Sequence, residues 1–296
     1  MVQAPVALRV DVDTRRGLHE GVPRLLDVFR RLGITASFFV TMGPDRSGLA
    51  IRRVWRPSFL LKMLRTNPFR LYGVRTLLSG TLLPAQPVGA GAPSLLRQIA
   101  TEGHEVAPHG WDHVTWQDRV ERLSPAALRA DLTAAARAFE TVFGTRPSAS
   151  AAPGWRTSDA ALVMQEELGL RYASDVRGRT VFRPRVGGGV LKTPQIPTTM
   201  PTIDELLGRE RNVSAALTAA LGDGLNVFTL HAEVEGGALL DLFTGWLEDL
   251  RGAGRSFVRV CDLAEAALER SIPAGAVTHG HVAGRSGWVA AAVGGA

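Results

Sequence analysis

The side chains in this sequence that are best suited to chemistry are carboxylates and imidazoles at the ends of apolar runs. Asp11 and Asp13 close the run VALRVDVD and, being two residues apart, point to one face of a regular strand. Two neighbouring carboxylates repel each other, and a cation beside them relieves that repulsion. Taken alone, the pair is also compatible with a turn or a helix cap before Thr14 and Arg15.

The second candidate is the motif HGWDH, which contains His109 and His113. Histidines four residues apart converge on one face of a helical turn, a spacing that suits metal ligands. The spacing also occurs by chance, but a carboxylate from another strand end would complete a two-histidine, one-carboxylate set for zinc or another divalent transition metal. Such a set leaves coordination positions open for water and substrate. Asp112 could orient an imidazole or cap a helix, and the sequence leaves both open.

A third apolar run, FTLH, ends at His231. A histidine at a strand end is often only a hydrogen-bonded rim residue. Here a functional interpretation is favoured, because the metal site needs a separate general acid. The single cysteine, Cys261, excludes a disulfide framework and a cysteine-based zinc site.

The elements that must position these residues alternate between apolar strands and amphipathic helices, which predicts a parallel barrel or a doubly wound sheet. In both architectures the carboxyl ends of the strands carry the functional residues. The expected strands are 6–12, 35–41, 104–108, 148–152, 171–175, 225–231 and 256–260, and the expected helices are 20–32, 93–101, 124–143, 158–168, 211–221, 238–251 and 262–270.

The net charge of +6 is concentrated in one stretch, since no Asp or Glu occurs between Arg46 and Thr101. We expect residues 44–92 to form a basic helical insertion that faces an anion or an anionic surface. No nucleic-acid-binding motif accompanies the charge, so no nucleic-acid partner is expected. The basic residues between Arg46 and Thr101, of which all but Arg97 lie in the expected insertion, are Arg46, Arg52, Arg53, Arg56, Lys62, Arg65, Arg70, Arg75 and Arg97.

The two ends of the chain carry little functional signal. The N-terminus lacks the basic and apolar regions of a secretory signal, and no run of eighteen apolar residues predicts a membrane span. A reducing, cytoplasmic setting fits. Residues 1–272 are expected to form one catalytic domain, and the Gly- and Ala-rich residues 273–296 a flexible tail.

Together, the Asp-x-Asp, HxxxH and strand-end histidine motifs resemble the polysaccharide deacetylase (NodB-homology) superfamily. Within it, the sequence resembles the bacterial deformylases that act on 4-deoxy-4-formamido-L-arabinose linked to undecaprenyl phosphate, from about residue 6 to 270. The resemblance implies a distorted (β/α)7 TIM-like barrel. The stretches that carry it are LRVDVDT, LHEGVPRLLDVF, FLLKMLRTNPFRLYG, HEVAPHGWDHVTWQ, SAAPGWR, LRYASDVRG, FRP, QIPTTMPTIDELLGR and FTLHAEVEGG.

The resemblance also implies residue roles. Asp11 would be the general base, His231 the general acid, and Asp13, His109 and His113 the ligands of one divalent ion, with zinc, cobalt, manganese or nickel as candidates. Asp175 would orient the catalytic groups, together with Arg156 or Arg177. The third motif departs from the family pattern Arg-x-Pro-aromatic, because AAPGWR displaces its arginine to Arg156. A backbone N–H near Gly154 or Trp155 could supply an oxyanion donor.

The implied activity is metal-dependent deformylation that yields formate and the lipid-linked amino sugar, for lipid A modification and polymyxin resistance. The enzyme would then lie peripherally on the cytoplasmic face of the inner membrane. The alternative for the insertion is a solvated helix packed on the barrel. The residues expected to contact membrane or lipid phosphate are Arg52, Arg53, Trp55, Arg56, Phe59, Lys62, Arg65, Arg70 and Tyr72.

Other activities stay open at this point. An N-deacetylase acting on peptidoglycan or another acetylated glycan differs only in the acyl group it releases. A non-haem iron oxygenase could use the same ligand set, but it would require an all-β chain, which the alternation of strands and helices opposes. A non-catalytic lipid-binding protein would not need all five candidate residues.

Overall fold

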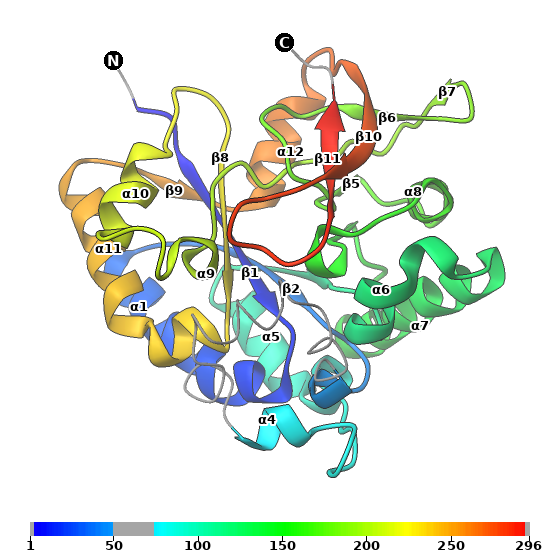
Figure 1. Cartoon of the computed structure of the whole chain (residues 1–296), viewed down its shortest axis with the longest axis horizontal. Helices are drawn as coiled ribbons and strands as arrows, with labels where there is room; N and C mark the ends of the chain where they lie inside the picture. The colour runs from blue at the N-terminus through cyan, green and yellow to red at the C-terminus, as the bar shows by residue number, and fades with distance from the viewer. Residues whose placement is uncertain (1–2, 50–73, 294–296) are drawn as a thin grey trace.

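The centre of the molecule is a parallel sheet in which β1 (Val6–Val12) lies between β2 (Ser37–Val40) and β8 (Asn226–His231). The computed structural model describes residues 3–49 and 74–293 (Figure 1). β3 (Glu105–Pro108) pairs with β2, and the short β9 (Phe257–Val258) pairs with the start of β1. Every residue of β1 is buried, as the apolar run predicts for a strand of a parallel sheet.

Short strands and irregular backbone close this sheet into a ring. β4 (Ala149–Ser150) continues from β3 and pairs in parallel with β5 (Tyr172–Ala173), and the backbone around residues 194–199 then joins β5 to β8. The predicted barrel-like arrangement is therefore confirmed. The linking N–H to O hydrogen bonds are Ala151 to Pro108 (3.1 Å), Ile196 to Ala173 (2.8 Å) and Thr199 to Val227 (3.1 Å).

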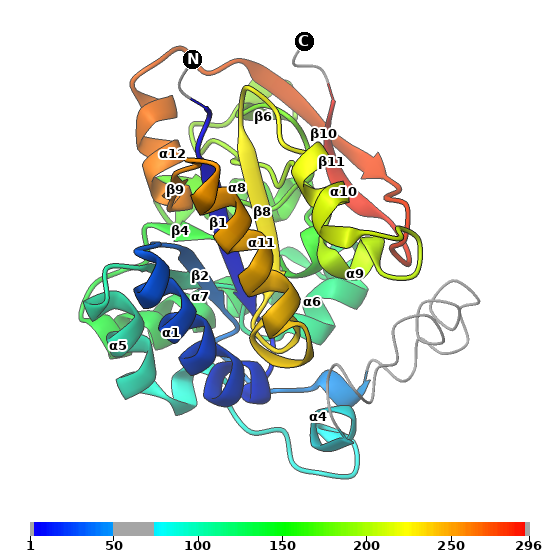
Figure 2. The same cartoon turned by 90° about the vertical axis from the view of Figure 1, so that its left-hand side faces the viewer.

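The alternation of side chains along β1 separates two environments. Leu8 and Val10 face outward into the main core, beneath α1 (Val22–Leu32) and α11 (Leu240–Gly252). Figure 2 shows α11 lying over β1 and β8, with α1 beside it. The intervening positions, which begin at Ala7, point into the ring. The inward face of β1 therefore carries the charged residues into the interior of the protein.

The remaining helices surround the ring, and those that the sequence predicts lie close to their expected positions. Proline at the first turn and a serine cap, Ser124, begin α7 (Pro125–Phe143), the longest helix in the described part of the chain, as the sequence indicates. The sequence analysis missed α6, α9, β6 (Arg183–Val186) and β7 (Gly189–Val190). The helices are α5 (Pro93–Thr101), α6 (His113–Arg119), α7 (Pro125–Phe143), α8 (Asp159–Glu167), α9 (Ile203–Leu206), α10 (Val213–Ala219) and α12 (Val260–Leu268).

The flexible tail expected at 273–296 is wrong for its described part. β10 (Ala274–Gly280) pairs with β6 and, antiparallel, with β11 (Val289–Val293). The Trp288 ring stacks on His279 with ring centroids 4.0 Å apart. The small residues that suggested a loose tail instead allow close strand packing, because a Cβ on Gly280 would lie only 3.0 Å from that of Ala291.

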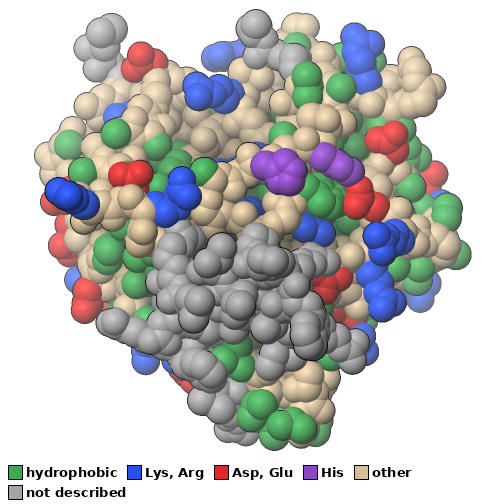
Figure 3. Space-filling view, in the orientation of Figure 1, with side chains coloured by type: hydrophobic (Ala, Val, Ile, Leu, Met, Phe, Trp, Pro, Cys, Tyr) green, Lys and Arg blue, Asp and Glu red, His purple; other side chains and the backbone are tan. Residues whose placement is uncertain are grey.

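Part of the expected insertion lies within the described residues. They include α4 (Val74–Leu78) and the turn after it, where Leu82 is 81% exposed. All the residues expected to contact the membrane, from Arg52 to Tyr72, lie outside the described ranges. Hydrophobic side chains gather at the lower edge of the molecule, where α4 lies (Figures 1 and 3). No helix within the described ranges is long and apolar enough to cross a bilayer.

The loops that follow β1 and β8 pack closely against each other at Gly21. A Cβ on Gly21 would lie 1.9 Å from the carbonyl oxygen of Ala232, which follows β8 directly. The π-helical turns Gly17–Gly21 and Val234–Ala238 can therefore pack against each other only because this position has no side chain. The contact fixes the relative positions of the two strand ends that carry candidate residues.

We expect Gly21→Ala to lower the free energy of unfolding by about 1–3 kcal/mol, because the added methyl group overpacks a fixed backbone contact. The matched control is Gly245→Ala in α11, where a Cβ has no neighbour within 4 Å. That change should raise stability by about 0.5–1 kcal/mol, since alanine favours a helix interior. Urea unfolding of both variants tests the pair, and equal effects at the two positions would contradict the argument.

Candidate active site

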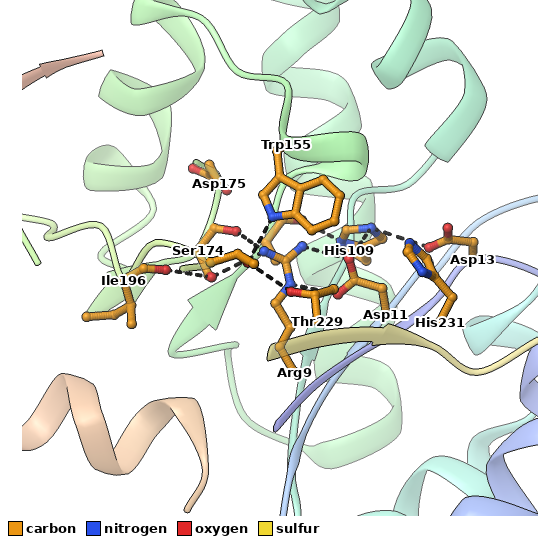
Figure 4. Close-up of polar contacts among 12 residues, drawn as sticks. Arg9, Asp11, Asp13, His109, Trp155, Ser174, Asp175, Ile196, Thr229 and His231 are labelled. Carbon is orange, nitrogen blue, oxygen red and sulfur yellow. Dashed lines mark hydrogen bonds and ion pairs between the residues drawn. The ribbon is translucent and has the colours of Figure 1, made fainter. Parts of the chain in front are cut away.

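The candidate residues meet at the carboxyl ends of neighbouring strands. Asp11 and His231 are register partners on β1 and β8. Asp13 follows β1, His109 follows β3, and His113 is the first residue of α6. Figure 4 shows Asp11, Asp13, His109 and His231 side by side. The structure thus brings together the five residues to which the sequence analysis gave the central roles.

Asp13, His109 and His113 form a group that could hold a metal ion, with one ligand atom from each within 4.8 Å of the others. Asp13 Oδ1 lies 3.4 Å from His109 Nε2, and Asp13 Oδ2 lies 3.2 Å from His113 Nε2. Asp13 Oδ1 and His109 Nε2 are buried without a hydrogen-bond partner. Because buried polar atoms are normally satisfied, two unpartnered atoms of this kind, side by side, fit a divalent cation.

The charge states of the ligands also suit a metal. His109 Nδ1 lies 2.9 Å from the Ala151 carbonyl oxygen, so Nδ1 carries the proton and donates it, and Nε2 keeps its lone pair. Burial lowers the pKa of His109 to about 4, which keeps the ring neutral at neutral pH. Burial by itself would raise the pKa of Asp13, but attraction to His113 and His109 holds that pKa well below its usual range.

The loop that carries the two histidines is held by side-chain caps. Asp112 accepts the Thr115 N–H at 3.0 Å and so caps α6, which decides between the two roles the sequence left open. Asp131, from α7, accepts the N–H groups of Trp111 and Asp112 at 3.0 Å each. These bonds fix the start of α6 and with it the direction of His113.

Asp11 stands beside the metal-ligand group but is held by an arginine. Arg9 donates from Nε to Asp11 Oδ1 at 2.7 Å and from Nη2 to Oδ2 at 2.8 Å, and both side chains are buried. The Oδ2 atom of Asp11 lies 3.5 Å from His109 Nε2. Sequence reasoning missed Arg9, although a usable signal was present: it is a charged residue within an apolar strand, on the same face as Asp11 and Asp13.

His231 is bordered by Trp155 and Glu235. The Trp155 ring meets the His231 ring edge-on, with centroids 6.3 Å apart. The backbone N–H of His231 donates to Glu235 Oε2 at 2.7 Å, and burial raises the pKa of Glu235 to about 8. The backbone N–H of Trp155, a candidate oxyanion donor, donates to the Ala152 carbonyl oxygen at 3.2 Å and is therefore engaged within its own turn.

The structure places Arg156 away from the position that the resemblance implied. Gly154 and Trp155 both have left-handed φ angles, 64° and 52°, and this turn directs the Trp155 ring toward Arg9. Arg156 instead donates to the Gln117 carbonyl oxygen at 2.8 Å and lies over the Trp288 ring. It joins α6 to the C-terminal strands, and the guanidinium at Asp11 belongs to Arg9.

Asp175 and Arg177 lie near the candidate residues without joining the metal-ligand group. Asp175 is fully buried and accepts from Gln195 Nε2 at 3.0 Å, and burial raises its pKa. In Figure 4 it lies on the far side of Arg9 from His231. Arg177 pairs with Glu205 at 3.1 Å and lies over the Trp155 ring. The orienting role expected for Asp175 stays a prediction.

A residue from the expected tail also reaches this region. The Arg285 guanidinium lies 4.4 Å from the centroid of the Trp155 ring and donates to the Gly154 carbonyl oxygen at 3.3 Å. No sequence motif predicted this contact, because it depends on how the strands β10 and β11 return across the barrel.

The profile of the polysaccharide deacetylase family matches residues 3–173. The chain therefore belongs to this family, whose members are metal-dependent hydrolases of amide bonds. Among its relatives is "Probable 4-deoxy-4-formamido-L-arabinose-phosphoundecaprenol deformylase ArnD" of Shewanella sediminis, 39% identical over 96% of this chain and 93% of the relative. A protein of the same name from Wigglesworthia glossinidia brevipalpis is 32% identical over 93% of this chain and 97% of its own.

Solved structures support the fold. A mutant of the peptidoglycan deacetylase PdaC from Bacillus subtilis has a TM-score of 0.54 at 17% identity, over 90% of this chain and 93% of its own. An allantoinase has a TM-score of 0.58 at 17% identity, over 86% and 76%. A pseudoenzyme of family CE4 from Bacillus anthracis has a TM-score of 0.54 at 14% identity, over 88% and 66%.

We expect Asp13→Asn to weaken the binding of cobalt(II) or zinc by more than about 100-fold. Loss of groups that merely support a ligand costs about 10–100-fold in metal affinity, and this change removes an anionic ligand itself. Isothermal titration of the metal-free protein measures the effect. Asp27→Asn, an exposed carboxylate on α1, is the control and should bind as the wild type does. Unchanged affinity in Asp13→Asn would remove this residue from the ligand set.

Proposed function

We propose that this protein hydrolyses the formamide of 4-deoxy-4-formamido-L-arabinose carried on undecaprenyl phosphate, releasing formate and leaving the amino sugar on its lipid. The observation that carries the proposal is the geometry at the strand ends. Three residues form one metal-ligand group, and two further groups, Asp11 and His231, stand beside it on adjacent strands. The relatives of 39% and 32% identity, named for this substrate, support the choice of acyl group and carrier.

The proposed mechanism assigns one step to each side chain. Asp13, His109 and His113 would hold a divalent metal, which when bound would supply Lewis-acid polarisation of the amide and of water. Asp11, whose two oxygens accept hydrogen bonds from Arg9, takes the proton of the attacking water. His231 gives a proton to the sugar nitrogen as the C–N bond breaks. One water is consumed, and formate and a free amine result.

The acid and the base are suited to opposite sides of one amide. Because Asp11 and His231 are register partners on neighbouring parallel strands, their side chains emerge at the same level of the barrel end. The ring of Trp155 borders His231 on one side, which restricts the positions that the imidazole can take. This arrangement suits proton transfer to the leaving nitrogen while the base acts on water.

The membrane part of the proposal concerns the basic segment. We propose that the protein lies peripherally on the cytoplasmic face of the inner membrane, with Arg52, Arg53, Arg56 and their aromatic neighbours at the lipid phosphates. In Figures 1 and 2, the carboxyl ends of β1 and β8 point toward the part of the molecule where α4 lies. The exposed Leu82 and Leu83, which follow α4, would add apolar contact on that side.

The biological role follows from the product. A free amino sugar on undecaprenyl phosphate can serve lipid A modification, and with it polymyxin resistance. The second candidate function is N-deacetylation of a glycan, which the likeness to peptidoglycan deacetylase supports at the level of fold. The ligand group suits zinc, cobalt, manganese or nickel, and a single ion of this class is proposed.

The direct test is product release by purified, metal-loaded protein in detergent. We expect formate from the lipid-linked formamido sugar, and none after chelation. Asp11→Asn should lower kcat by about 10²–10⁴-fold, the usual contribution of a general base, while metal affinity stays unchanged. Asp27→Asn serves again as the charge-matched control. Acetate from an acetylated glycan without any formate would favour the deacetylase, and full activity in Asp11→Asn would remove it as base.

Flotation with vesicles that contain anionic lipid tests the membrane proposal. Replacing Arg52, Arg53 and Arg56 by Gln should weaken vesicle binding on the order of 100-fold, since each basic residue near an anionic leaflet contributes about 1 kcal/mol. Replacing Arg24, Arg31 and Arg129 by Gln removes the same charge from exposed positions elsewhere and should have little effect. Equal losses in both triple variants would contradict a specific surface.

A further inference from the structure

Arg9 lies in the interior of the barrel, where an unpaired cation would be strongly unfavourable. Arg9 is 0% exposed, and the residues before and after it on the inward face are Ala7 and Asp11. Its side chain must therefore find compensating partners inside the protein. In the proposed mechanism Asp11 acts as a base, and its carboxylate must be held in one orientation to do so.

The guanidinium is bonded on two sides. Toward β1, Nε and Nη2 donate to the two oxygens of Asp11 at 2.7 and 2.8 Å. Toward β5, Nη1 donates to the carbonyl oxygen of Ser174 and lies 3.2 Å from its hydroxyl. That hydroxyl donates to the Ile196 carbonyl oxygen at 2.7 Å. Arg9 thus connects the base to the backbone that closes the ring (Figure 4).

Two aromatic rings border the same guanidinium. The carbon at its centre lies 5.3 Å from the centroid of Phe39 and 5.4 Å from that of Trp155. Both contacts favour the cation and restrict the guanidinium plane. Trp155 is itself held by a hydrogen bond from Nε1 to Thr198 Oγ1 at 2.9 Å. The guanidinium is therefore fixed by groups from β1, β2, the turn at Trp155 and the loop after β5.

This anchoring fixes the orientation of the Asp11 carboxylate. A two-point bond from a planar guanidinium fixes the plane of a carboxylate, whereas a single bond leaves it free to rotate. With that plane fixed, Asp11 Oδ2 stays 3.5 Å from His109 Nε2, next to the metal-ligand group. A lysine at position 9 could supply the charge but not two parallel bonds together with the bond to Ser174.

We propose that Arg9 is the positioning residue of the general base, holding the Asp11 carboxylate in its working plane during amide hydrolysis. The proposal rests on the function proposed above. The third motif, with its displaced Arg156, does not bring a guanidinium to Asp11. Arg9, on β1, supplies that guanidinium instead. Arg9 does not touch the reacting atoms and acts through Asp11.

The test combines Arg9→Met and Arg9→Lys with Asp11→Asn. Arg9→Met should lower kcat by about 100-fold, the effect of a misplaced catalytic group, with KM and metal affinity within about threefold of wild type. Arg9→Lys should keep part of the lost activity. In the Asp11→Asn background, Arg9→Met should cause no further loss, because the two residues act as a unit. Losses that multiply, or a change only in KM, would overturn the proposal.

A second measurement does not depend on turnover. Removing Arg9 alone leaves a buried carboxylate unpaired, so Arg9→Met should unfold at lower urea concentration than the double variant Arg9→Met, Asp11→Asn. Arg255→Met, which loses a partly buried arginine bonded to the Ala4 carbonyl at the other end of β1, is the control and should show no coupling to Asp11.

The two measurements distinguish a failure of the proposed function from a failure of the role proposed for Arg9. If the wild type releases acetate and not formate, the proposed substrate falls, and the kcat comparison is made on acetate release. If it releases neither, the proposed function falls, and the unfolding comparison decides whether Arg9 holds Asp11. If Arg9→Met does not fold, Arg9→Lys takes its place in both experiments. Additive effects on unfolding would overturn the proposal in every case.

Discussion

The strand β1 carries charged side chains into the closed interior of the barrel, and the rest of the structure must compensate those charges. Positions 9, 11 and 13 of the chain share a side-chain direction with Ala7, so a cation and two carboxylates follow one another along the inside of the barrel end. Arg9 neutralises Asp11 directly, and the Asp13 carboxylate is left to the two histidines. In a poorly solvated interior an uncompensated charge is strongly unfavourable. The irregular features nearby, above all the left-handed turn at Gly154 and Trp155, place a ring beside the Arg9 guanidinium.

Local signals in the sequence were enough to predict the architecture and the central residues. Each strand of the central sheet is an apolar run, and Asp11, His109 and His231 mark the points where three of these runs end. Such signals need only a few consecutive residues, because side-chain alternation and helix caps are local properties. The partner of Asp11 is also local, since Arg9 lies two residues before it in the same apolar run. The placement of Arg156 could not be predicted, since it depends on two backbone angles at Gly154 and Trp155.

The C-terminal strands illustrate the opposite situation. Their composition, rich in Gly and Ala, lacks the period that indicates a strand, and their pairing partner, β6, lies far earlier in the chain. Yet this segment brings Arg285 onto Trp155 and Trp288 under Arg156. The family profile ends at residue 173, before β8 and these strands begin. The Trp155 ring, which borders His231, is therefore contacted by a segment that the shared family pattern does not describe.

A common barrel does not by itself determine the chemistry, because structures of similar fold include an allantoinase and a pseudoenzyme. What matters is how the few polar groups at the strand ends are divided between binding a metal and moving protons. Asp11 and Asp13 are chemically the same and two residues apart, but only Asp13 belongs to the ligand group. The difference lies in their partners: both oxygens of Asp11 are engaged by Arg9, while Asp13 Oδ1 has no hydrogen-bond partner. In the proposed mechanism, this engagement of Asp11 by Arg9 would hold one carboxylate back from the ligand set, leave coordination positions open for water and substrate, and keep a separate base beside them.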